Sequence, residues 1–281
     1  MSELKTLTDG LTFPEGPRWH GGKLWFSDFY SHRVIAVDLD GRAETMLRVP
    51  QQPSGLGWLP DGSLLVVSML DRKLMRWHAG ELTEYADLSG VTGGPCNDMV
   101  VDGQGRAYVG NFGYDRFAGE PERTTCLVRV DPDRSIHVAT EELLFPNGTV
   151  ITPDGKRLII GETIGQCLTI FDIEADGSLA NRGVFAAIPE MFPDGICLDA
   201  EGAVWFSNPR KGYVARIFEG GRIDRTIPVG TGRNAYACML GGPDGRTLFI
   251  CTNTGSGADM AKKTDGRIET IQVDVPGVGW P

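Results

Sequence analysis

Histidine is scarce in this chain, which has four histidines among its 281 residues, and no serine stands in a Gly-x-Ser-x-Gly phrase. A hydrolase of the serine type needs a histidine base beside an exposed serine, so that class has little support. The phosphate loop, the Gly-x-Gly-x-x-Gly fingerprint of dinucleotide-binding domains and the His-Glu-x-x-His zinc motif are also absent. Chemistry that depends on these motifs is therefore not expected.

The chain also lacks the features of a protein that binds nucleic acid or a membrane. With 37 acidic and 27 basic residues its net charge is −10, which argues against a nucleic-acid groove and against contact with an anionic membrane. No apolar run approaches the length of a transmembrane helix. The first residues, Met1–Lys5, contain no apolar leader. We therefore expect a cytoplasmic protein.

The six cysteines form no Cys-x-x-Cys pair and no regular framework. We interpret Cys96, Cys197 and Cys238 as small core residues rather than as ligands. Cys96 needs separate attention because it directly precedes a candidate site residue, Asn97.

What the chain does contain is a repeat of short apolar strands, each beginning after a glycine turn. The turns recur about every 40 to 50 residues, a period typical of propeller blades. The strands after them are rich in β-branched and aromatic residues, as in Lys23–Ser27 and Ala203–Ser207. The turn glycines are Gly22, Gly62, Gly105, Gly155, Gly202 and Gly245. The repeat predicts an all-β, six-bladed β-propeller, and we expect residues 1–281 to form one domain.

Each repeat also has a first strand of small residues, which suits the crowded axis of a propeller. Side chains at the start of these strands should ring one mouth of the central channel. The predicted ring is Glu15, Ser54, Asn97, Asn147, Asp194 and Tyr236. Two segments, Leu4–Leu7 and Glu269–Val273, are both candidates for the strand that closes the propeller.

Three members of the ring, Glu15, Asn147 and Asp194, stand in the same phrase of Phe-Pro, an acid or amide, and Gly. Each could be an ordinary turn residue, but three at one phase of a repeat predict one shared place. Two carboxylates and an amide oxygen form a hard oxygen site, which suits Ca²⁺, Mg²⁺ or Mn²⁺ better than structural zinc. Coordination positions left open would let the cation polarise a carbonyl or lower the pKa of a bound water.

Asn97 and Asp98 begin the third inner strand at the same phase. Asn97 is a candidate fourth metal ligand or a hydrogen-bond donor to substrate. Because alternate strand residues face opposite sides, we expect Asp98 to face away from Asn97 and to orient a neighbouring loop or ligand.

With these residues in place, the chain resembles the senescence-marker-protein/gluconolactonase/luciferin-regenerating-enzyme family of regucalcin-like six-bladed propellers. The resemblance covers about residues 13–255. Its phrases are Glu15-Gly-Pro-x-Trp, Asn97-Asp followed by Asp102-Gly-x-Gly-Arg106, Asn147-Gly-x-x-x-x-Pro-Asp-Gly, and Pro193-Asp194-Gly195 with Asp199-Ala-Glu-Gly-x-x-Trp205.

The resemblance implies a metal-dependent hydrolase, in most of the family a lactonase acting on sugar or other lactones. It implies that Glu15, Asn147 and Asp194 bind one divalent metal ion, Ca²⁺ first, with Mg²⁺, Mn²⁺, Zn²⁺ or Fe²⁺ as alternatives. It assigns Asp194 as general base and Asn97 as a contact to substrate or metal. Where sugar-lactonase members carry an arginine two residues before that asparagine, this chain has Pro95.

The substrate is expected to be a small lactone or ester. Aromatic residues predicted at the mouth favour a less polar substrate than an aldonolactone, although they could equally pack the tops of the blades. They are Phe112, Tyr114, Phe117, Phe145, Phe192 and Tyr236. Two alternatives use the same site: hydrolysis of organophosphates or phosphotriesters, and divalent-cation binding without catalysis.

Overall fold

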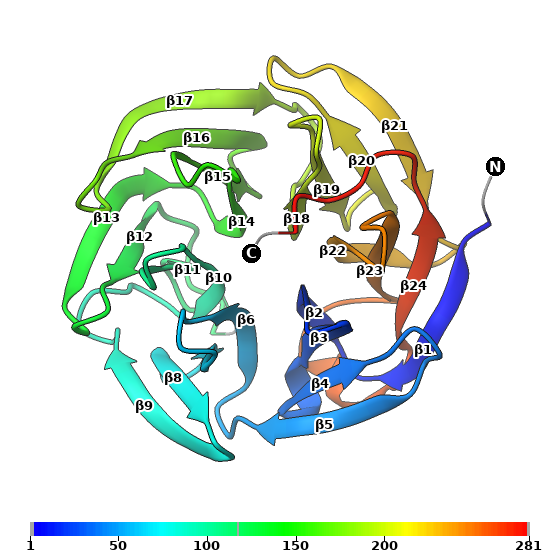
Figure 1. The fold of residues 1–281 in the computed structure, drawn as a ribbon, viewed down its shortest axis with the longest axis horizontal. Helices are drawn as coiled ribbons and strands as arrows, with labels where there is room; N and C mark the ends of the chain where they lie inside the picture. The colour runs from blue at the N-terminus through cyan, green and yellow to red at the C-terminus, as the bar shows by residue number, and fades with distance from the viewer. Residues whose placement is uncertain (1–2, 117, 280–281) are drawn as a thin grey trace.

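The fold is a ring of six four-stranded antiparallel sheets around a central axis, seen in a computed structural model that describes residues 3–116 and 118–279 (Figure 1). The prediction of an all-β, six-bladed propeller is confirmed. Apart from strands, the described residues form two short 3-10 turns, η1 (Phe29–Ser31) and η2 (Ala258–Lys262). No helix in the described part of the chain has the length and apolarity needed to cross a membrane.

Every blade runs from an inner strand at the axis to an outer strand at the rim. The inner strands are β2 (Pro14–His20), β6 (Pro53–Trp58), β10 (Cys96–Val101), β14 (Pro146–Ile151), β18 (Ile196–Leu198) and β22 (Asn234–Gly241). The second strands are β3 (Lys23–Asp28), β7 (Leu64–Ser68), β11 (Ala107–Asn111), β15 (Arg157–Glu162), β19 (Val204–Asn208) and β23 (Thr247–Asn253).

The third strands are β4 (Arg33–Val37), β8 (Lys73–His78), β12 (Thr125–Val130), β16 (Cys167–Ile173), β20 (Tyr213–Ile217) and β24 (Gly266–Gln272). The outer strands are β5 (Ala43–Arg48), β9 (Glu81–Asp87), β13 (Ile136–Leu143), β17 (Leu179–Ala187), β21 (Ile223–Pro228) and β1 (Lys5–Leu11). We number the blades 1 to 6 by their inner strands in chain order.

Both segments proposed for closing the ring take part in the closure. β24 pairs with β23 as the third strand of blade 6, and β1 from the start of the chain pairs with β24 as its outer strand. The register places Lys5 opposite Thr270. The last blade is therefore built from both ends of the sequence, which ties the ring shut (Figure 1).

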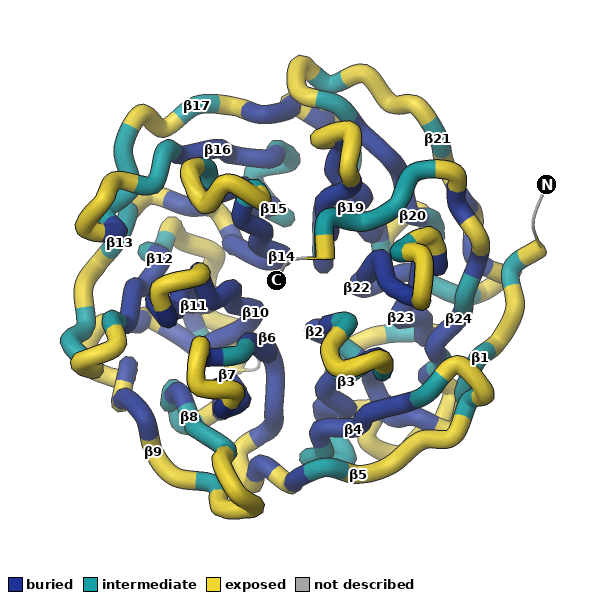
Figure 2. Tube along the Cα trace, viewed as in Figure 1, coloured by how far each residue is buried: buried dark blue, intermediate teal, exposed yellow. Residues whose placement is uncertain are grey.

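Small residues let the inner strands approach one another at the axis. A Cβ on Gly195 would lie 2.4 Å from the Cβ of Ala237, and a Cβ on Gly148 would lie 2.4 Å from the backbone nitrogen of Ile196. A side chain at either position would push neighbouring blades apart. The inner strands are accordingly buried while the rim is exposed (Figure 2).

Apolar side chains fill the spaces between blades, with Trp205, Tyr108 and Phe26 among the largest that are fully buried. Cys96, Cys197 and Cys238 are buried in these cores, and all six cysteines are free. Burial raises the pKa of the Cys96 thiol to about 12. The interpretation of these cysteines as core residues is confirmed, Cys96 included.

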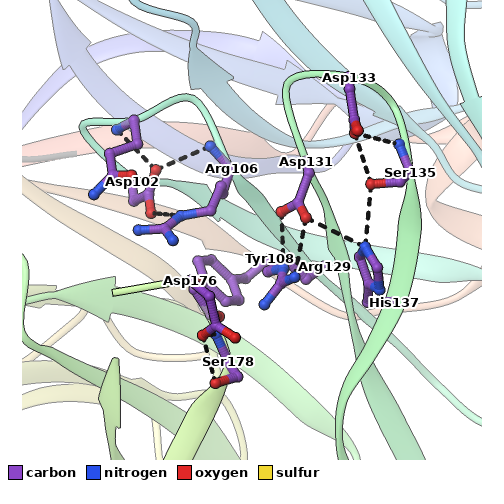
Figure 3. Close-up of polar contacts among 12 residues, drawn as sticks. Asp102, Arg106, Tyr108, Arg129, Asp131, Asp133, Ser135, His137, Asp176 and Ser178 are labelled. Carbon is purple, nitrogen blue, oxygen red and sulfur yellow. Dashed lines mark hydrogen bonds and ion pairs between the residues drawn. The ribbon is translucent and has the colours of Figure 1, made fainter. Parts of the chain in front are cut away.

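Buried carboxylates at the end of the propeller where the inner strands finish are paired with arginines. Asp102 accepts a hydrogen bond from Arg106 Nε at 2.6 Å, and Arg106 Nη1 donates to the backbone oxygen of Ala175 in the next blade. Figure 3 shows this pair beside a second one, Arg129 with Asp131, at 2.8 Å. These contacts close turns and link blades 3 and 4, so their role is structural.

Candidate metal and active site

A cavity of about 660 Å³ opens at the other end of the propeller, where the inner strands begin. Five of the six predicted ring residues line it: Glu15, Asn97, Asn147, Asp194 and Tyr236. The sixth, Ser54, is buried behind Asn97 and donates from its Oγ to Asn97 Oδ1 at 3.2 Å. The structure therefore brings together the side chains that the repeat placed at one mouth of the channel.

Glu15 is presented by an irregularity at the start of β2. The pairing of β2 with β3 shifts between Glu15 and Arg18, and Gly16 adopts a left-handed φ of 56°, as a bulge requires. Upstream, the backbone nitrogens of Thr12 and Phe13 donate to Asp28 Oδ1 at 2.9 and 2.7 Å. These bonds fix the entry to the strand, and Glu15 Oε2 accepts from the Gly16 nitrogen.

Asp194 is held by the backbones of three neighbouring blades. Its nitrogen donates to Ser207 in its own blade, and its carbonyl oxygen accepts from Gly148 in blade 4 at 3.1 Å. The next residue, Gly195, donates to Tyr236 in blade 6 at 2.8 Å. The segment before β18 is therefore fixed on both sides, which suits a catalytic or ligating side chain.

A chain of hydrogen bonds orients the two asparagine amides. The Thr163 hydroxyl donates to the Pro193 carbonyl at 2.7 Å, so it accepts from Asn147 Nδ2 at 3.2 Å. This assigns the other end of the amide, Asn147 Oδ1, to the side of Asn97, whose Nδ2 donates to it at 3.1 Å. A carbonyl oxygen has two lone pairs, so Asn147 Oδ1 keeps capacity for a further partner.

The two acids of the ring repel one another in a partly desolvated place. Burial raises the pKa of Glu15 well above its ordinary value, and the nearby Asp194 charge raises it further. Burial also raises the pKa of Asp194 to about 7, against the lowering effects of the Arg116 charge and of a hydrogen bond from Asn147. Both side chains are half-buried and face the cavity.

This donor set fits a hard divalent cation. Two carboxylates whose ionisation is disfavoured without a counter-charge, and an amide oxygen held in a fixed orientation, are oxygen ligands of the kind Ca²⁺ and Mg²⁺ take. Among residues 3–116 and 118–279, no three His, Cys, Asp or Glu side chains are grouped to hold a metal. The proposed set differs from such a group because half of its four members are asparagines.

Asp98, expected to face away from Asn97, does not line the cavity that Asn97 lines, and its partner lies on another blade. The pairing of β10 with β11 shifts between Cys96 and Met99. Asp98 pairs with Arg18 of β2, two blades away, at 3.0 Å, and Arg18 also donates to the Met99 carbonyl at 2.6 Å. This buried pair crosses the channel close to the ring acids.

Most of the aromatic residues predicted at the mouth pack together and also line the cavity. Phe112 and Phe145 stack with ring centroids 4.7 Å apart, and Tyr236 packs on Phe13 at 4.6 Å, all within one buried cluster. Phe112, Tyr114, Phe145 and Tyr236 also line the cavity. Phe192 packs instead against Arg210, and Phe117 lies outside the described residues.

Sequence patterns did not single out Thr163, Arg18 or Arg116. Thr163 follows β15 and belongs to no repeated phrase, so only its contacts identify it. Arg18 had a signal, since it is a charged residue within an inner strand of small and apolar residues. Arg116 lies in the Phe112–Phe117 segment, which matches no other repeat.

Comparison with known proteins agrees with the fold and with the family resemblance. A family model described as SMP-30/gluconolactonase/LRE-like region matches residues 13–254. The 6-deoxy-6-sulfogluconolactonase of Pseudomonas putida is 26% identical over 268 residues, covering 92% of this chain and 89% of that protein. Regucalcin of Gallus gallus is 27% identical over 260 residues, covering 90% and 86%.

A solved structure of luciferin-regenerating enzyme superposes with a TM-score of 0.85 at 16% identity, covering 100% of this chain and 98% of that one. At that identity the likeness shows the fold alone.

Proposed function

The chain belongs to the SMP-30/gluconolactonase/LRE-like family, and on this premise we propose that it is a divalent-cation-dependent lactonase. One observation carries the proposal: Glu15 and Asp194, with raised pKa values, meet the Asn147 and Asn97 amides on the floor of one cavity. The relative from Pseudomonas putida is named as a lactonase, which supports the same reaction class.

Glu15, Asn147 and Asp194 would hold the cation, and Asn97 would be either a fourth ligand or a substrate contact. A bound divalent cation supplies polarisation of an ester carbonyl and a lowered pKa for a nearby water. Because a carboxylate that binds a cation becomes a weaker base, the ligand role of Asp194 is better supported than its role as a base.

The chain's own groups would share the remaining work. A water molecule forms a bond to the lactone carbonyl carbon, and Asp194 takes the proton that this water loses. The bond from that carbon to the ring oxygen then breaks, and Asp194 returns the proton to the departing oxygen. Asn97 Nδ2 donates one hydrogen to Asn147 and can give its second to the substrate. Hydrolysis thus balances with one water added.

The cavity walls favour a lactone with an apolar portion. Phe13, Phe29, Phe112, Tyr114 and Phe145 line one side of the opening. Stacking against these rings would bury apolar parts of the substrate. The same aromatic side favours one second candidate, the hydrolysis of neutral phosphotriesters with apolar substituents. Cation binding without turnover is the third outcome that an assay can return.

The test is a substrate panel on protein first stripped of metal by a chelator. Gluconolactone, an aryl lactone such as dihydrocoumarin, and a phosphotriester are each assayed before and after adding Ca²⁺, Mg²⁺, Mn²⁺, Zn²⁺ or Fe²⁺. We expect turnover of lactones only, restored by at least one cation. Turnover of the phosphotriester alone would replace the lactonase proposal, and stoichiometric cation binding with no turnover would reduce the site to a binding site.

A further inference from the structure

The cavity has two chemically different sides. Blades 1, 3 and 4 contribute the aromatic side described above, and blades 5 and 6 contribute a polar side. The polar side consists of Arg210, Asn234, the Tyr236 hydroxyl and Ser256. A plain lactone would need only the floor of the cavity, so the polar side requires a separate explanation.

Arg210 lies against an aromatic ring, and no charged partner for it is found among the described residues. It lies in the turn between β19 and β20, and its guanidinium carbon sits 3.8 Å from the centroid of the Phe192 ring. A cation over an aromatic face is attracted and restrained. Within the described residues, no carboxylate forms an ion pair with Arg210.

The other arginines of blade 5 behave differently. Arg216 pairs with Asp199, Arg222 with Asp224 and Arg225 with Asp274. Arg210 alone among the four arginines of β18 to β21 lies at the cavity and lacks such a partner in the described part of the chain. Its donors are thus available to a molecule in the cavity.

The turn that carries Arg210 is tied to the start of β22. With its amide nitrogen facing the turn, Asn234 donates to the Pro209 carbonyl at 2.9 Å, and its Oδ1 then faces the Tyr236 hydroxyl. A Cβ on Gly212 would lie 2.9 Å from the Arg233 carbonyl, so the turn packs closely on blade 6. Arg210 is therefore preorganised rather than carried on a loose loop.

The blade-3 side of the cavity is also charged. Glu120 and Glu122 belong to the segment between β11 and β12, and Glu120 pairs with Arg123 at 3.0 Å. Arg116 of the same segment also lines the cavity, so this side carries charges of both signs, whereas Asp194 and Arg210 are the charged lining residues of blade 5.

We propose that Arg210, with Ser256, binds an anionic group of the substrate, a carboxylate or a sulfonate, at the end remote from the lactone ring. The planar guanidinium can form two parallel hydrogen bonds to such an oxyanion. This inference rests on the proposed lactonase function, since it names the substrate class of that same site. It makes Arg210 a determinant of specificity and leaves the hydrolytic step to the floor residues.

The kinetic test compares two lactones that differ only in a remote substituent, carboxylate against methyl ester, with the sulfonate as a further arm. For Arg210→Met we expect kcat/KM on the anionic lactones to fall about 10-fold or more through KM, since charge-assisted hydrogen bonds to the anionic group are lost. The methyl ester should change by less than about 2-fold. Equal losses on both substrates, or none on the anionic ones, would overturn the inference.

Arg222→Met is the matched control. Arg222 also lies over an aromatic ring of blade 5, Phe218 at 4.1 Å, but at the far end of the blade from the cavity. If removing any arginine of blade 5 lowered kcat/KM, both variants would show the loss. If the anion subsite is the cause, only Arg210→Met should lose the preference for the anionic substrate. Arg210→Lys should recover part of the preference for the anionic substrate.

A binding measurement separates this inference from the proposed function. Tetrahydropyran-2-carboxylate, a ring acid that cannot be hydrolysed, and its methyl ester are titrated into the calcium-loaded protein by calorimetry. If no lactone is turned over yet the acid binds better than the ester and loses that advantage in Arg210→Met, the anion subsite stands and the lactonase fails. If lactones are hydrolysed and the acid has no advantage, the subsite fails and the lactonase stands.

Discussion

Asp194 and Asp199 stand at the two ends of strand β18 and have opposite surroundings. Asp199 is fully buried, accepts from Arg216 Nε at 2.6 Å and from two backbone nitrogens of its turn, Glu201 and Ala203. Asp194 faces the cavity, where burial raises its pKa to about 7 against the lowering effects of the Arg116 charge and of a hydrogen bond from Asn147.

This difference shows that the same repeat supplies both residues that stabilise the fold and residues that form the site. At one end of the propeller the charge of a buried acid is satisfied within the chain, so the acid stabilises a turn and links elements. At the other end two acids are placed where their ionisation is unfavourable. Perturbed carboxylates that converge in a cavity mark functional sites more often than structural ones, and a cation would relieve their repulsion.

The largest contrast is expected in activity. Asp194→Asn should lower kcat/KM on the preferred lactone by about 10²–10⁴, the usual contribution of a general acid or base, with further loss from weaker cation binding. Initial rates at saturating Ca²⁺ measure it. Full activity in this variant would remove Asp194 from the mechanism.

Substitution of Asp199, at the end of β18 remote from the cavity, should lower the stability of the protein rather than its activity. Asp199→Asn leaves Arg216 short of one of its three acidic partners, and loss of one partner of a buried pair costs about 3–5 kcal/mol. Because Glu201 and Asp224 remain, we expect the lower end of that range in denaturant unfolding.

The control for Asp199→Asn is to measure calcium binding and turnover of the molecules that remain folded. Calcium affinity and kcat of the folded fraction should match the wild type within about 2-fold, since Asp199 has no contact with the cavity. A variant with normal stability but lost calcium binding would show that the two ends of β18 are not separate in role.

The next largest effect is expected in calcium affinity when the hydroxyl that orients Asn147 is removed. Thr163→Val removes the hydroxyl that orients the amide and keeps the shape of the side chain. Loss of a group that orients a metal ligand typically costs 10–100-fold in affinity, so calorimetry should show calcium binding weakened by about that factor. Thr163→Ser, which keeps the hydroxyl, should restore most of it; an equal loss in both variants would contradict the role.

The smallest contrast is a pH effect on the metal-free protein. The pKa of Asp194 is raised from 3.8 to about 7 in the folded chain, so between those pH values the folded state binds a proton that the unfolded state has released. Stability contributed by this group is complete below about pH 4 and is lost as pH rises through about 7. The raised pKa of Glu15 acts in the same direction.

Thermal unfolding in chelator from pH 5 to pH 8 checks this sign. The melting temperature should fall with pH by a few degrees in the wild type, less in Asp194→Asn, and little when Ca²⁺ is present. A melting temperature that rises with pH in chelator would contradict the assignment of these acids as destabilising when ionised.

The sequence was sufficient for the fold and for the ring because turn glycines set the phase of every blade. The shared position of Glu15, Asn97, Asn147 and Asp194 within their repeats was enough to predict that they lie together. The repeat could not predict the partner of Asp98, because Arg18 lies two blades away and no local phrase links the two residues. Arg210 and Thr163 escaped notice for the same reason: their roles arise from contacts between blades, which no local phrase encodes.

Calorimetric titration of Ca²⁺ into chelator-treated protein at pH 8 tests the central claim most directly. The wild type should bind one ion per chain, while Asp194→Asn and Glu15→Gln should each bind it at least about 100-fold more weakly, because each loses a charged ligand. Asp199→Asn, from the other end of the same strand, should bind like the wild type. Wild-type affinity in Asp194→Asn and Glu15→Gln would contradict the account.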